Sequence, residues 1–265
     1  MHYDYQGKHI FVAGGTSGIN LGIAQGFAAA GGKLSVLSRK QEKVEAAVQL
    51  LQSEGGEAGG YAADVRDYDA VAESLKQARE ARGEIDVLIS GAAGNFIAPA
   101  LGLSANAFKT VVDIDLLGTF NVLRAGYEYL HKPGAAVINI TAPQAWLPTP
   151  LQVHACAAKA GMDQLTRTLA MEWGPAGVRV NAIAPGPIED TEGMRKLAPP
   201  SEAAQKRLTE SIPLRRNGKK QDIARAALWL ASEEASYVNG IILPVDGGWS
   251  LGGSLSMFAM PDTSG

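Results

Sequence analysis

A glycine-rich stretch near the N-terminus has the residue types and spacing of a phosphate-binding loop. It runs from Gly14 to Asn20, directly after the apolar run HIFVA and before a helical stretch. Glycines let the backbone turn sharply and approach a pyrophosphate closely, and the free N–H groups at the start of the helix then face the phosphates. The alternative is a glycine-rich turn that merely opens a helix. The position of the loop predicts dinucleotide binding, through Gly14, Thr16, Ser17, Gly18 and Ile19.

The residues after the second apolar run indicate which dinucleotide binds. This run ends in Leu37-Ser38-Arg39-Lys40, whereas NAD-specific enzymes place an acidic residue near this point to bind the ribose hydroxyls. An arginine suits a 2′-phosphate, because the guanidinium makes charge-assisted, bidentate hydrogen bonds. Ser38 and Arg39 therefore favour NADPH over NADH. The alternative is a solvated basic start of a helix that binds no anion.

His154 and Cys156 lie close together in the sequence and could suggest a base beside a nucleophile. Residues at positions i and i+2 of a helix do not face each other, so no catalytic thiol is expected, and Cys156 is expected to be buried. A single cysteine also excludes an internal disulfide and a cysteine-rich zinc site. The other histidines are scattered along the chain, and no metal site is predicted.

Short apolar runs alternate with longer amphipathic stretches along the whole chain. Because each run is apolar on both faces, the runs predict a parallel sheet buried on both sides. The alternation predicts a single Rossmann-type, doubly wound α/β domain over residues 1–265, with a seven-stranded parallel sheet. The predicted strands are Lys8–Ala13, Lys33–Leu37, Ala58–Ala63, Ile85–Ile89, Ala135–Ile140, Arg179–Ile183 and Gly240–Pro244. The predicted helices include Ile19–Ala30, Gln41–Glu54, Tyr68–Arg82, Ala107–Leu130 and Val153–Trp173.

The segment from Pro185 to Lys220 interrupts this alternation with prolines, charges and two short helical pieces. A long irregular excursion in a compact domain is usually functional or mobile, so residues 186–218 are expected to form a small lid over the ligand cleft. The glycine- and serine-rich tail from Gly247 to Gly265 has little helix or strand signal. We expect this tail either to pack against a partner subunit or to be loose.

The overall composition excludes several classes of function. The chain has 265 residues, a net charge of −3 and a pI near 5.8, so no basic surface for nucleic acid or an anionic membrane is expected. The N-terminus resembles neither a signal peptide nor a transit peptide, and the C-terminus has no peroxisomal Ser-Lys-Leu signal. No apolar run reaches the roughly 20 residues that span a bilayer. A cytoplasmic location without membrane insertion is predicted.

Four motifs follow the predicted strands in order along the chain. The glycine motif reads Gly14-x3-Gly18-Ile19, with Asn20 where a third glycine is usual, and the others are Asp64-Val65, Ala92-Ala93-Gly94, and Asn181 with Pro185-Gly186. Together these motifs resemble those of the short-chain dehydrogenase/reductase family over nearly the whole chain. The resemblance implies that they bind the cofactor, with further contacts from Lys159, Ile188 and Thr191.

The catalytic positions of this family depart from the usual pattern. The family has a Tyr four residues before an active-site Lys and a Ser thirteen residues before that Tyr. Here Lys159 is present, but the Tyr position is Ala155 and the Ser position is Ala142. The active-site Asn of the family corresponds to Asp115. The interconversion of ketones and alcohols by the usual family mechanism should therefore be severely impaired.

One branch of the family, the peroxisomal type of 2,4-dienoyl-CoA reductase, resembles this chain in these departures as well. The branch implies that Asp115 and Lys159 carry the site. The mitochondrial type uses a Tyr fifteen residues before the Lys, where this chain has Gln144. The similar segments are Ala92–Phe96, Asn106–Thr110, Asp113–Asp115, Gly118–Asn121, Leu151–Ala155, Glu172–Pro175, Ala184–Ile188 and Thr191–Gly193.

The resemblance implies NADPH-dependent reduction of 2,4-dienoyl-CoA to 3-enoyl-CoA, an auxiliary step in the β-oxidation of unsaturated fatty acids. During this reduction, negative charge moves through the diene onto the thioester oxygen, and the α carbon is then protonated. Neither step needs a tyrosine at a carbonyl. Lys159 would bind the nicotinamide ribose, and Asp115 with Lys159 would hold and polarise the water that donates the proton. The alternative interpretations are that Asp115 is a buried structural residue and that Lys159 is a surface residue without a catalytic role.

The phosphates of CoA call for positive groups at the rim of the cleft. By the pattern of the branch, the substrate contacts are Arg66, Phe96, Ser104, Asn106, Arg195 and Lys196, although the branch usually has Arg at the last position. The alternatives are a solvated residue at a helix start for Arg66, a core aromatic for Phe96, and an exposed helix face for Arg195 and Lys196.

Two other functions stay open at this point. The Asp115–Lys159 pair could reduce another activated alkene or carbonyl compound. Alternatively, the chain could bind NADPH with little turnover, since Ala142 and Ala155 both lack the usual side chains. The resemblance also implies a homotetramer or homodimer, in which the helices Ala107–Leu130 and Val153–Trp173 pair across an interface.

Overall fold

The computed structural model describes residues 3–197 and 201–254. Within these ranges, one sheet has seven parallel strands in the order β3-β2-β1-β4-β5-β6-β7. The order reverses direction at β1 and β4, which is the doubly wound arrangement, so the predicted fold class is confirmed. The strands are β1 (His9–Ala13), β2 (Lys33–Ser38), β3 (Glu57–Ala62), β4 (Val87–Ser90), β5 (Ala136–Ile140), β6 (Arg179–Pro185) and β7 (Ile242–Val245).

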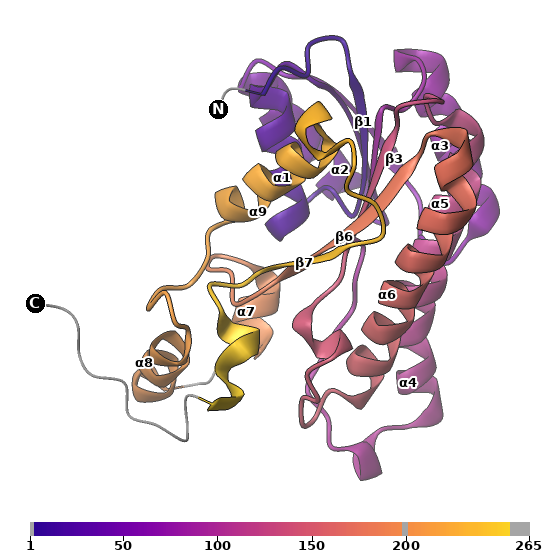
Figure 1. Cartoon of the computed structure of the whole chain (residues 1–265). Coiled ribbons are helices and arrows are strands. Elements are labelled where there is room, and N and C mark those ends of the chain that lie inside the picture. The colour runs from indigo at the N-terminus through magenta and orange to yellow at the C-terminus, as the bar shows by residue number, and fades with distance from the viewer. Residues whose placement is uncertain (1–2, 198–200, 255–265) are drawn as a thin grey trace, which may run out of the picture.

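Helices cover both faces of the sheet (Figure 1). Alternate side chains of β1 enter two separate hydrophobic clusters, because successive residues of a strand point to opposite faces. Phe11 and Ala13 pack under α3, α5 and α6, whereas Ile10 and Val12 pack under α1, α2 and α9. The helices are α1 (Gly18–Ala29), α2 (Gln41–Ser53), α3 (Tyr68–Arg82), α4 (Ala105–Val112), α5 (Gly118–Gly126), α6 (Val153–Trp173), α7 (Glu192–Leu197), α8 (Glu202–Ser211) and α9 (Lys220–Ala231).

The two edge strands differ from the predicted pattern of burial. All five residues of β1 are buried, but β3 alternates between buried and exposed positions, and β7 is only partly covered. The prediction that every strand is buried on both faces is therefore wrong for β3 and β7. Each of them has a neighbouring strand on one side only, so its side chains are shielded less than those of the central strands.

The predicted helix 107–130 begins at Ala105 and contains a π turn. Helix α4 passes through this turn, at residues 113–117, into α5 without a break in direction, and a short 3₁₀ turn then ends the element. A π turn adds one residue to a helical turn and is frequent at functional sites. A Cβ on Gly118, the next residue, would lie 2.6 Å from Cγ2 of Val65, so the glycine lets this helix approach the end of β3 closely.

The segment between β6 and α9 contains the two short helices α7 and α8, as predicted. Figure 1 shows both helices away from the layered body, at the same end of the molecule as α4. A 3₁₀ turn over Trp249–Ser254 follows β7. Residues 255–265 of the glycine- and serine-rich tail lie outside the described residues.

Candidate active site

The residues predicted to bind the cofactor follow successive strands at one edge of the sheet. All strands are parallel, so the segments that follow their carboxyl ends meet at this edge. The segments after β1, β2, β3, β4 and β6 carry the loop Gly14–Ile19, Ser38 with Arg39, Asp64 with Val65, Ala92–Gly94, and Pro185–Thr191. Asn181 lies inside β6 instead, where its side chain bonds to the backbone of Val238 and Ile241.

The loop between β1 and α1 fits a bound pyrophosphate. Gly14 and Gly18 have φ values of +79° and +56°, which favour glycine, and a Cβ on Gly14 would lie 2.8 Å from the backbone N of Ala92. Ser17 is the N-cap of α1, with extended backbone, and its hydroxyl makes no capping hydrogen bond. The N–H groups of the first turn of α1 are thus left without a side-chain cap from Ser17, as an anion site requires.

Asn20 explains how this loop works without the third glycine. Its Nδ2 donates a hydrogen bond of 2.7 Å to the carbonyl oxygen of Gly91, at the end of β4. A Cβ on Gly91 would overlap the Asn20 carboxamide, so the asparagine in the loop requires a glycine at the neighbouring strand end. Oδ1 of Asn20 is buried without a partner among the described residues. The carboxamide therefore ties the loop to β4.

Three charged residues gather at the ends of β2 and β3. Arg66 holds the Asp64 carboxylate with two hydrogen bonds, from Nε at 3.0 Å and from Nη2 at 2.7 Å. Nη1 of Arg39 lies 4.0 Å from the same carboxylate, and the Arg39 side chain is 58% exposed. The hydrogen bond from Arg66 is the main cause that lowers the pKa of Asp64. Arg39 is held loosely enough to turn toward a phosphate, whereas Arg66 already has a partner.

Asp115 and Lys159 form a buried ion pair at the centre of this edge. Oδ2 of Asp115 lies 3.2 Å from Nζ of Lys159, and the side chains are 1% and 9% exposed. Oδ1 of Asp115 accepts a hydrogen bond of 2.7 Å from the backbone N–H of Gly94. Nζ of Lys159 also donates to the carbonyl oxygen of Ile140, at 3.2 Å. Since buried charges require partners, both side chains are held in fixed positions.

A second buried carboxylate lies one helical turn beyond Lys159. Asp163 accepts a hydrogen bond of 2.7 Å from Oγ1 of Thr141, the residue after β5. Burial raises the pKa of Asp163, and the hydrogen bond from Thr141, followed by the positive charges of Arg167 and Lys159, opposes that rise. Asp163 and Thr141 were not predicted from the sequence. The spacing of four residues between Lys159 and Asp163 places both on one helix face and was the available signal.

The loop after β4 is attached to the start of α6. Nδ2 of Asn95 donates to Oε1 of Gln152 at 2.7 Å, and the N–H of Ala98 donates to the carbonyl oxygen of Leu151 at 3.0 Å. Between these two bonds, the Phe96 ring packs against the His154 ring at an angle of 31°. Leu151 has a φ of +67°, which is strained for a branched residue. The strain and the bonds both concentrate where the loop meets the helix.

The remaining predicted residues have the following surroundings. The Ser104 hydroxyl caps α4 by accepting from the N–H of Ala107, and Asn106 and Arg195 are exposed. The Thr191 hydroxyl accepts a hydrogen bond from the N–H of Met194 and donates one to the carbonyl oxygen of Ile188. Thr191 and Ile188 are buried. The side chain of Lys196 lies outside the described residues.

Cys156 is half-buried, so the prediction that it is buried was wrong. It lies in the first turn of α6, and its thiol is 3.9 Å from the carbonyl oxygen of Thr149. The start of the helix is therefore packed less completely around this side chain than the interior of the domain.

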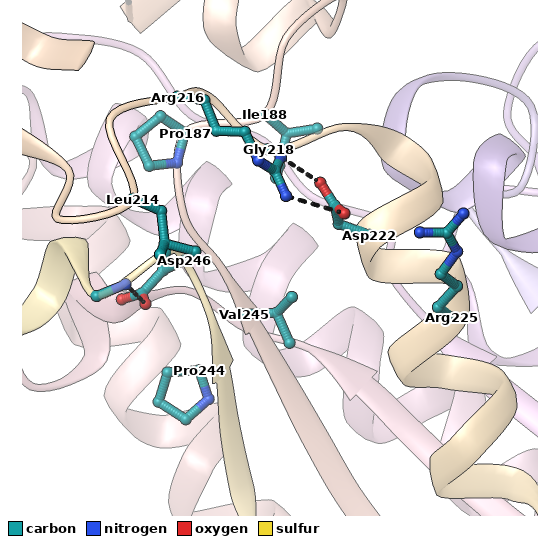
Figure 2. A pocket seen from close by; sticks show the side chains of 12 residues that line it. Pro187, Ile188, Leu214, Arg216, Gly218, Asp222, Arg225, Pro244, Val245 and Asp246 are labelled. Atoms are coloured by element: carbon teal, nitrogen blue, oxygen red, sulfur yellow. Dashed lines mark hydrogen bonds and ion pairs between the residues drawn. The ribbon is translucent and has the colours of Figure 1, made fainter. Parts of the chain in front are cut away.

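A cavity of about 540 Å³ lies beside the segment after β6 (Figure 2). Figure 2 shows Arg216 paired with Asp222 on one side and Asp246 on the other, with Pro244 and Val245 of β7 below them. Pro187 and Ile188 border the cavity, but Asp115 and Lys159 do not. It is therefore adjacent to the predicted cofactor segment and separate from the buried ion pair.

Comparison with known proteins agrees with this fold. A family model described as enoyl-(acyl carrier protein) reductase matches residues 13–250. The fold is similar to a crystal structure of a short chain dehydrogenase from Bacillus anthracis, with a TM-score of 0.82 and 38% identity, covering 96% of this chain and 99% of that one. The chain belongs to the short-chain dehydrogenase/reductase family. Membership makes it an oxidoreductase and implies a nicotinamide cofactor.

Two relatives of this short-chain dehydrogenase/reductase carry more specific names. It is 49% identical over 245 residues to a peroxisomal, (3E)-enoyl-CoA-producing 2,4-dienoyl-CoA reductase of Rattus norvegicus, covering 92% of this chain and 84% of the relative. It is 42% identical over 244 residues to a probable (2E)-enoyl-CoA-producing 2,4-dienoyl-CoA reductase of Bacillus subtilis, covering 91% of this chain and 96% of the relative. The resemblance to the dienoyl-CoA reductases is therefore confirmed.

Within residues 3–197 and 201–254, no helix is long and apolar enough to cross a membrane. The same residues contain no group of three or more His, Cys, Asp or Glu side chains arranged to hold a metal ion.

Proposed function

We propose that this short-chain dehydrogenase/reductase is an NADPH-dependent 2,4-dienoyl-CoA reductase that forms 3-enoyl-CoA. The buried Asp115–Lys159 ion pair carries this proposal. The pair lies where Ala142 and Ala155 remove the hydroxyl groups of the usual family mechanism. The relatives named as dienoyl-CoA reductases, at 40–49% identity in six organisms, support the same substrate class.

NADPH would occupy the loop and strand ends described above. Gly14, Thr16, Ser17, Gly18 and Ile19 would hold the pyrophosphate. Ser38 and Arg39 would hold the 2′-phosphate, and Asp64 with Val65 would border the adenine. The nicotinamide half would meet Ala92, Ala93, Gly94, Lys159, Pro185, Gly186, Ile188 and Thr191. When bound, this cofactor supplies the hydride of the reaction.

Asp115 and Lys159 act on the proton and the developing negative charge. The Lys159 ammonium stabilises negative charge that spreads toward the thioester oxygen during reduction of the diene. A carboxylate that is paired with an ammonium is a poor proton donor, so Asp115 orients a water rather than donating a proton itself. That water protonates the α carbon. The N–H of Gly94 and the carbonyl of Ile140 keep both side chains in place for this role.

Substrate would enter beside the loop after β4 and under the segment 186–218, which would act as a lid. Arg66, Arg195 and Lys196 would meet the CoA phosphates, because clustered cations bind phosphate through charge-assisted bonds. Phe96, Ser104 and Asn106 would border the acyl and pantetheine path. Phe96 is 37% exposed, so its ring is accessible to a ligand.

The position of the remaining double bond separates this proposal from a near alternative. The Rattus norvegicus relative is named for a (3E) product and the Bacillus subtilis relative for a (2E) product. Protonation at the α carbon, next to the water held by Asp115 and Lys159, gives the 3-enoyl product. Protonation at the γ carbon would give the 2-enoyl product instead.

The deciding experiment adds 2,4-hexadienoyl-CoA to the purified protein with NADPH or NADH. We expect loss of NADPH absorbance, a lower KM for NADPH than for NADH, and a 3-enoyl product identified by NMR. A 2-enoyl product would contradict the proposed site of protonation. Tight NADPH binding without turnover of any acyl-CoA would favour the low-turnover binding protein. Turnover of other activated alkenes or carbonyl compounds alone would favour the second enzymatic alternative.

Assembly and location complete the proposal. A homotetramer or homodimer would pair the helices around Ala107–Leu130 and Val153–Trp173, and a monomer in light scattering would refute it.

The cytoplasmic location stays a prediction, since six relatives are named as peroxisomal enzymes. Imaging of the tagged chain in its own cell would test this location.

A further inference from the structure

His154 is a buried imidazole that the fold does not satisfy. It lies in the first turn of α6, and its exposed fraction is 0%. Among residues 3–197 and 201–254, neither Nδ1 nor Nε2 has a hydrogen-bond partner. Burying an imidazole without partners leaves the loss of its water contacts uncompensated. Native proteins keep few such groups, so this one requires an explanation.

His9 shows how the same chain treats a histidine that serves only the fold. It is 1% exposed, and both ring nitrogens are satisfied. Nδ1 lies 2.9 Å from the carbonyl oxygen of Gly83, and Nε2 lies 2.9 Å from Oγ of Ser35. The contrast between the two imidazoles indicates that the partners of His154 are not supplied by the described chain itself.

The aromatic ring that packs against His154 is in a position to move. The Phe96 ring lies 4.4 Å from the imidazole, centroid to centroid, at an angle of 31°. Phe96 is 37% exposed and belongs to the loop after β4, whose Gly94 N–H bonds Asp115. Rotation of this exposed ring would open the imidazole without disturbing the hydrogen bonds of Asn95 and Ala98 on either side.

At the two positions where the family usually has hydroxyl groups, this chain has no side-chain donor for a carbonyl oxygen. Ala142 and Ala155 have no hydrogen-bonding side-chain atoms, and Lys159 is already bound to Asp115 and Ile140. His154 is adjacent in sequence to Ala155 on the same helix turn. An imidazole in any protonation state found in proteins carries at least one N–H, so it can donate to a carbonyl.

We infer that His154 binds a carbonyl oxygen of the acyl-CoA substrate after the Phe96 ring turns away. This inference rests on the proposed function and adds a residue to its substrate site. The carbonyl belongs either to the thioester or to a pantetheine amide, since both present the same acceptor. The imidazole stays unpaired in the free protein because its partner arrives with the substrate.

Replacing His154 with leucine tests the inference through two readouts that move in opposite directions. Removing an unsatisfied polar group is neutral or stabilising, so His154→Leu should keep or raise the thermal midpoint. Loss of one substrate hydrogen bond should raise the KM for 2,4-hexadienoyl-CoA about tenfold. His154→Gln, which retains an N–H donor, should recover most of that loss. His9→Leu is the control and should lower the midpoint while leaving the KM unchanged.

Calorimetric titration of 2,4-hexadienoyl-CoA into the protein saturated with NADP+, which cannot reduce the diene, separates this inference from the proposed function. If the wild type binds the substrate in this titration but shows no turnover in the NADPH assay, the proposed function is refuted, and the titration of His154→Leu still tests the role of His154. A wild-type affinity in His154→Leu would overturn the inference. Absence of binding to the wild type would overturn both.

A truncated substrate identifies the carbonyl. If the thioester carbonyl is bound, His154→Leu should lose the same factor in kcat/KM with S-ethyl 2,4-hexadienethioate as with the CoA thioester. A loss confined to the CoA thioester identifies a pantetheine amide. No loss with either compound would overturn the inference.

Discussion

Nζ of Lys159 lies 3.2 Å from Oδ2 of Asp115, and this ion pair is almost completely shielded from water. Each partner has one further anchor on the backbone, at Gly94 and at Ile140. The pair is therefore both a structural contact between two helices and the proposed catalytic centre. Variants that keep the shape and remove the charge separate these two roles.

Asp115→Asn should reduce kcat by about 100- to 10,000-fold, the usual contribution of a positioned proton-transfer group. The asparagine keeps an acceptor for the Gly94 N–H but removes the charge that orients the water. Steady-state turnover of 2,4-hexadienoyl-CoA measures this effect, with NADPH binding measured separately. Asp113→Asn, in the same π turn but paired with Lys109, is the matched control and should retain activity. A wild-type kcat in Asp115→Asn would refute its catalytic role.

Arg39→Ala should remove the preference for NADPH over NADH. Hydrogen bonds to charged groups are worth roughly 1.5–3 kcal/mol, so the KM for NADPH should rise about 10- to 100-fold. The KM for NADH should change little. Lys40→Ala is the control, because Lys40 is the next residue and pairs with Glu42. Equal effects of Arg39→Ala on both cofactors would show that Arg39 does not bind the 2′-phosphate.

Asp163→Asn should stabilise the fold increasingly as the pH rises from 4 to 7. Burial raises the pKa of Asp163, so its contribution to stability is present below its unfolded pKa and is lost as the pH rises through the folded pKa. Asparagine avoids this loss and still accepts from Thr141. Each unit of pKa difference corresponds to about 1.4 kcal/mol. Urea unfolding across this pH range measures the effect.

Asp222→Asn is the control of opposite sign for that experiment. The hydrogen bond from Arg216 lowers the pKa of Asp222, so its contribution is present above the unfolded pKa and is lost as the pH falls through the folded pKa. Asp222→Asn should therefore be less stable than the wild type at pH 7, with a difference that shrinks below pH 4. A pH-independent difference for Asp163→Asn would show that its carboxyl is not perturbed in the folded state.

Asn20→Gly should destabilise the chain by about 1–2 kcal/mol although it introduces the glycine that the family usually has. The change removes the hydrogen bond to Gly91 and adds backbone freedom in α1. Gly91→Ala should also destabilise, because its Cβ would overlap the Asn20 carboxamide. The double variant should lose less than the two single losses combined. Strict additivity in denaturant unfolding would argue against the coupling.

The sequence predicts the fold because its signals are local. The alternation of apolar runs and amphipathic stretches is enough to give seven parallel strands, and helix Val153–Trp173 begins and ends where it was predicted. Burial of the edge strand β3 was predicted wrongly, because position in a sheet depends on the order of strands rather than on the residues of one strand. The π turn was also missed, since its residues are ordinary helix formers.

The candidate site is predictable only in part, for the same reason. Asp115 and Lys159 were identified through a resemblance, and their contact depends on how α6 packs against the π turn. Asp163 shows a four-residue spacing from Lys159, but its partner Thr141 comes from a distant strand end. Among the described residues, neither ring nitrogen of His154 has a hydrogen-bond partner. This property depends on the folded surroundings, and a pattern of residue types in the sequence cannot predict it.

The π turn at 113–117 also bears on how this enzyme could change its substrate range. Residues after the turn are fastened to the sheet side, through the Asn121 bond to Val65 and the Thr119 contact with Ser90. Deleting one residue of the turn would restore α-helical register and rotate α4 by about 100° about its axis. The proposed substrate contacts Ser104 and Asn106 would then face elsewhere, while the residues after the turn stayed in place. Length variation at this single point offers a route to new acyl specificities that point substitutions do not.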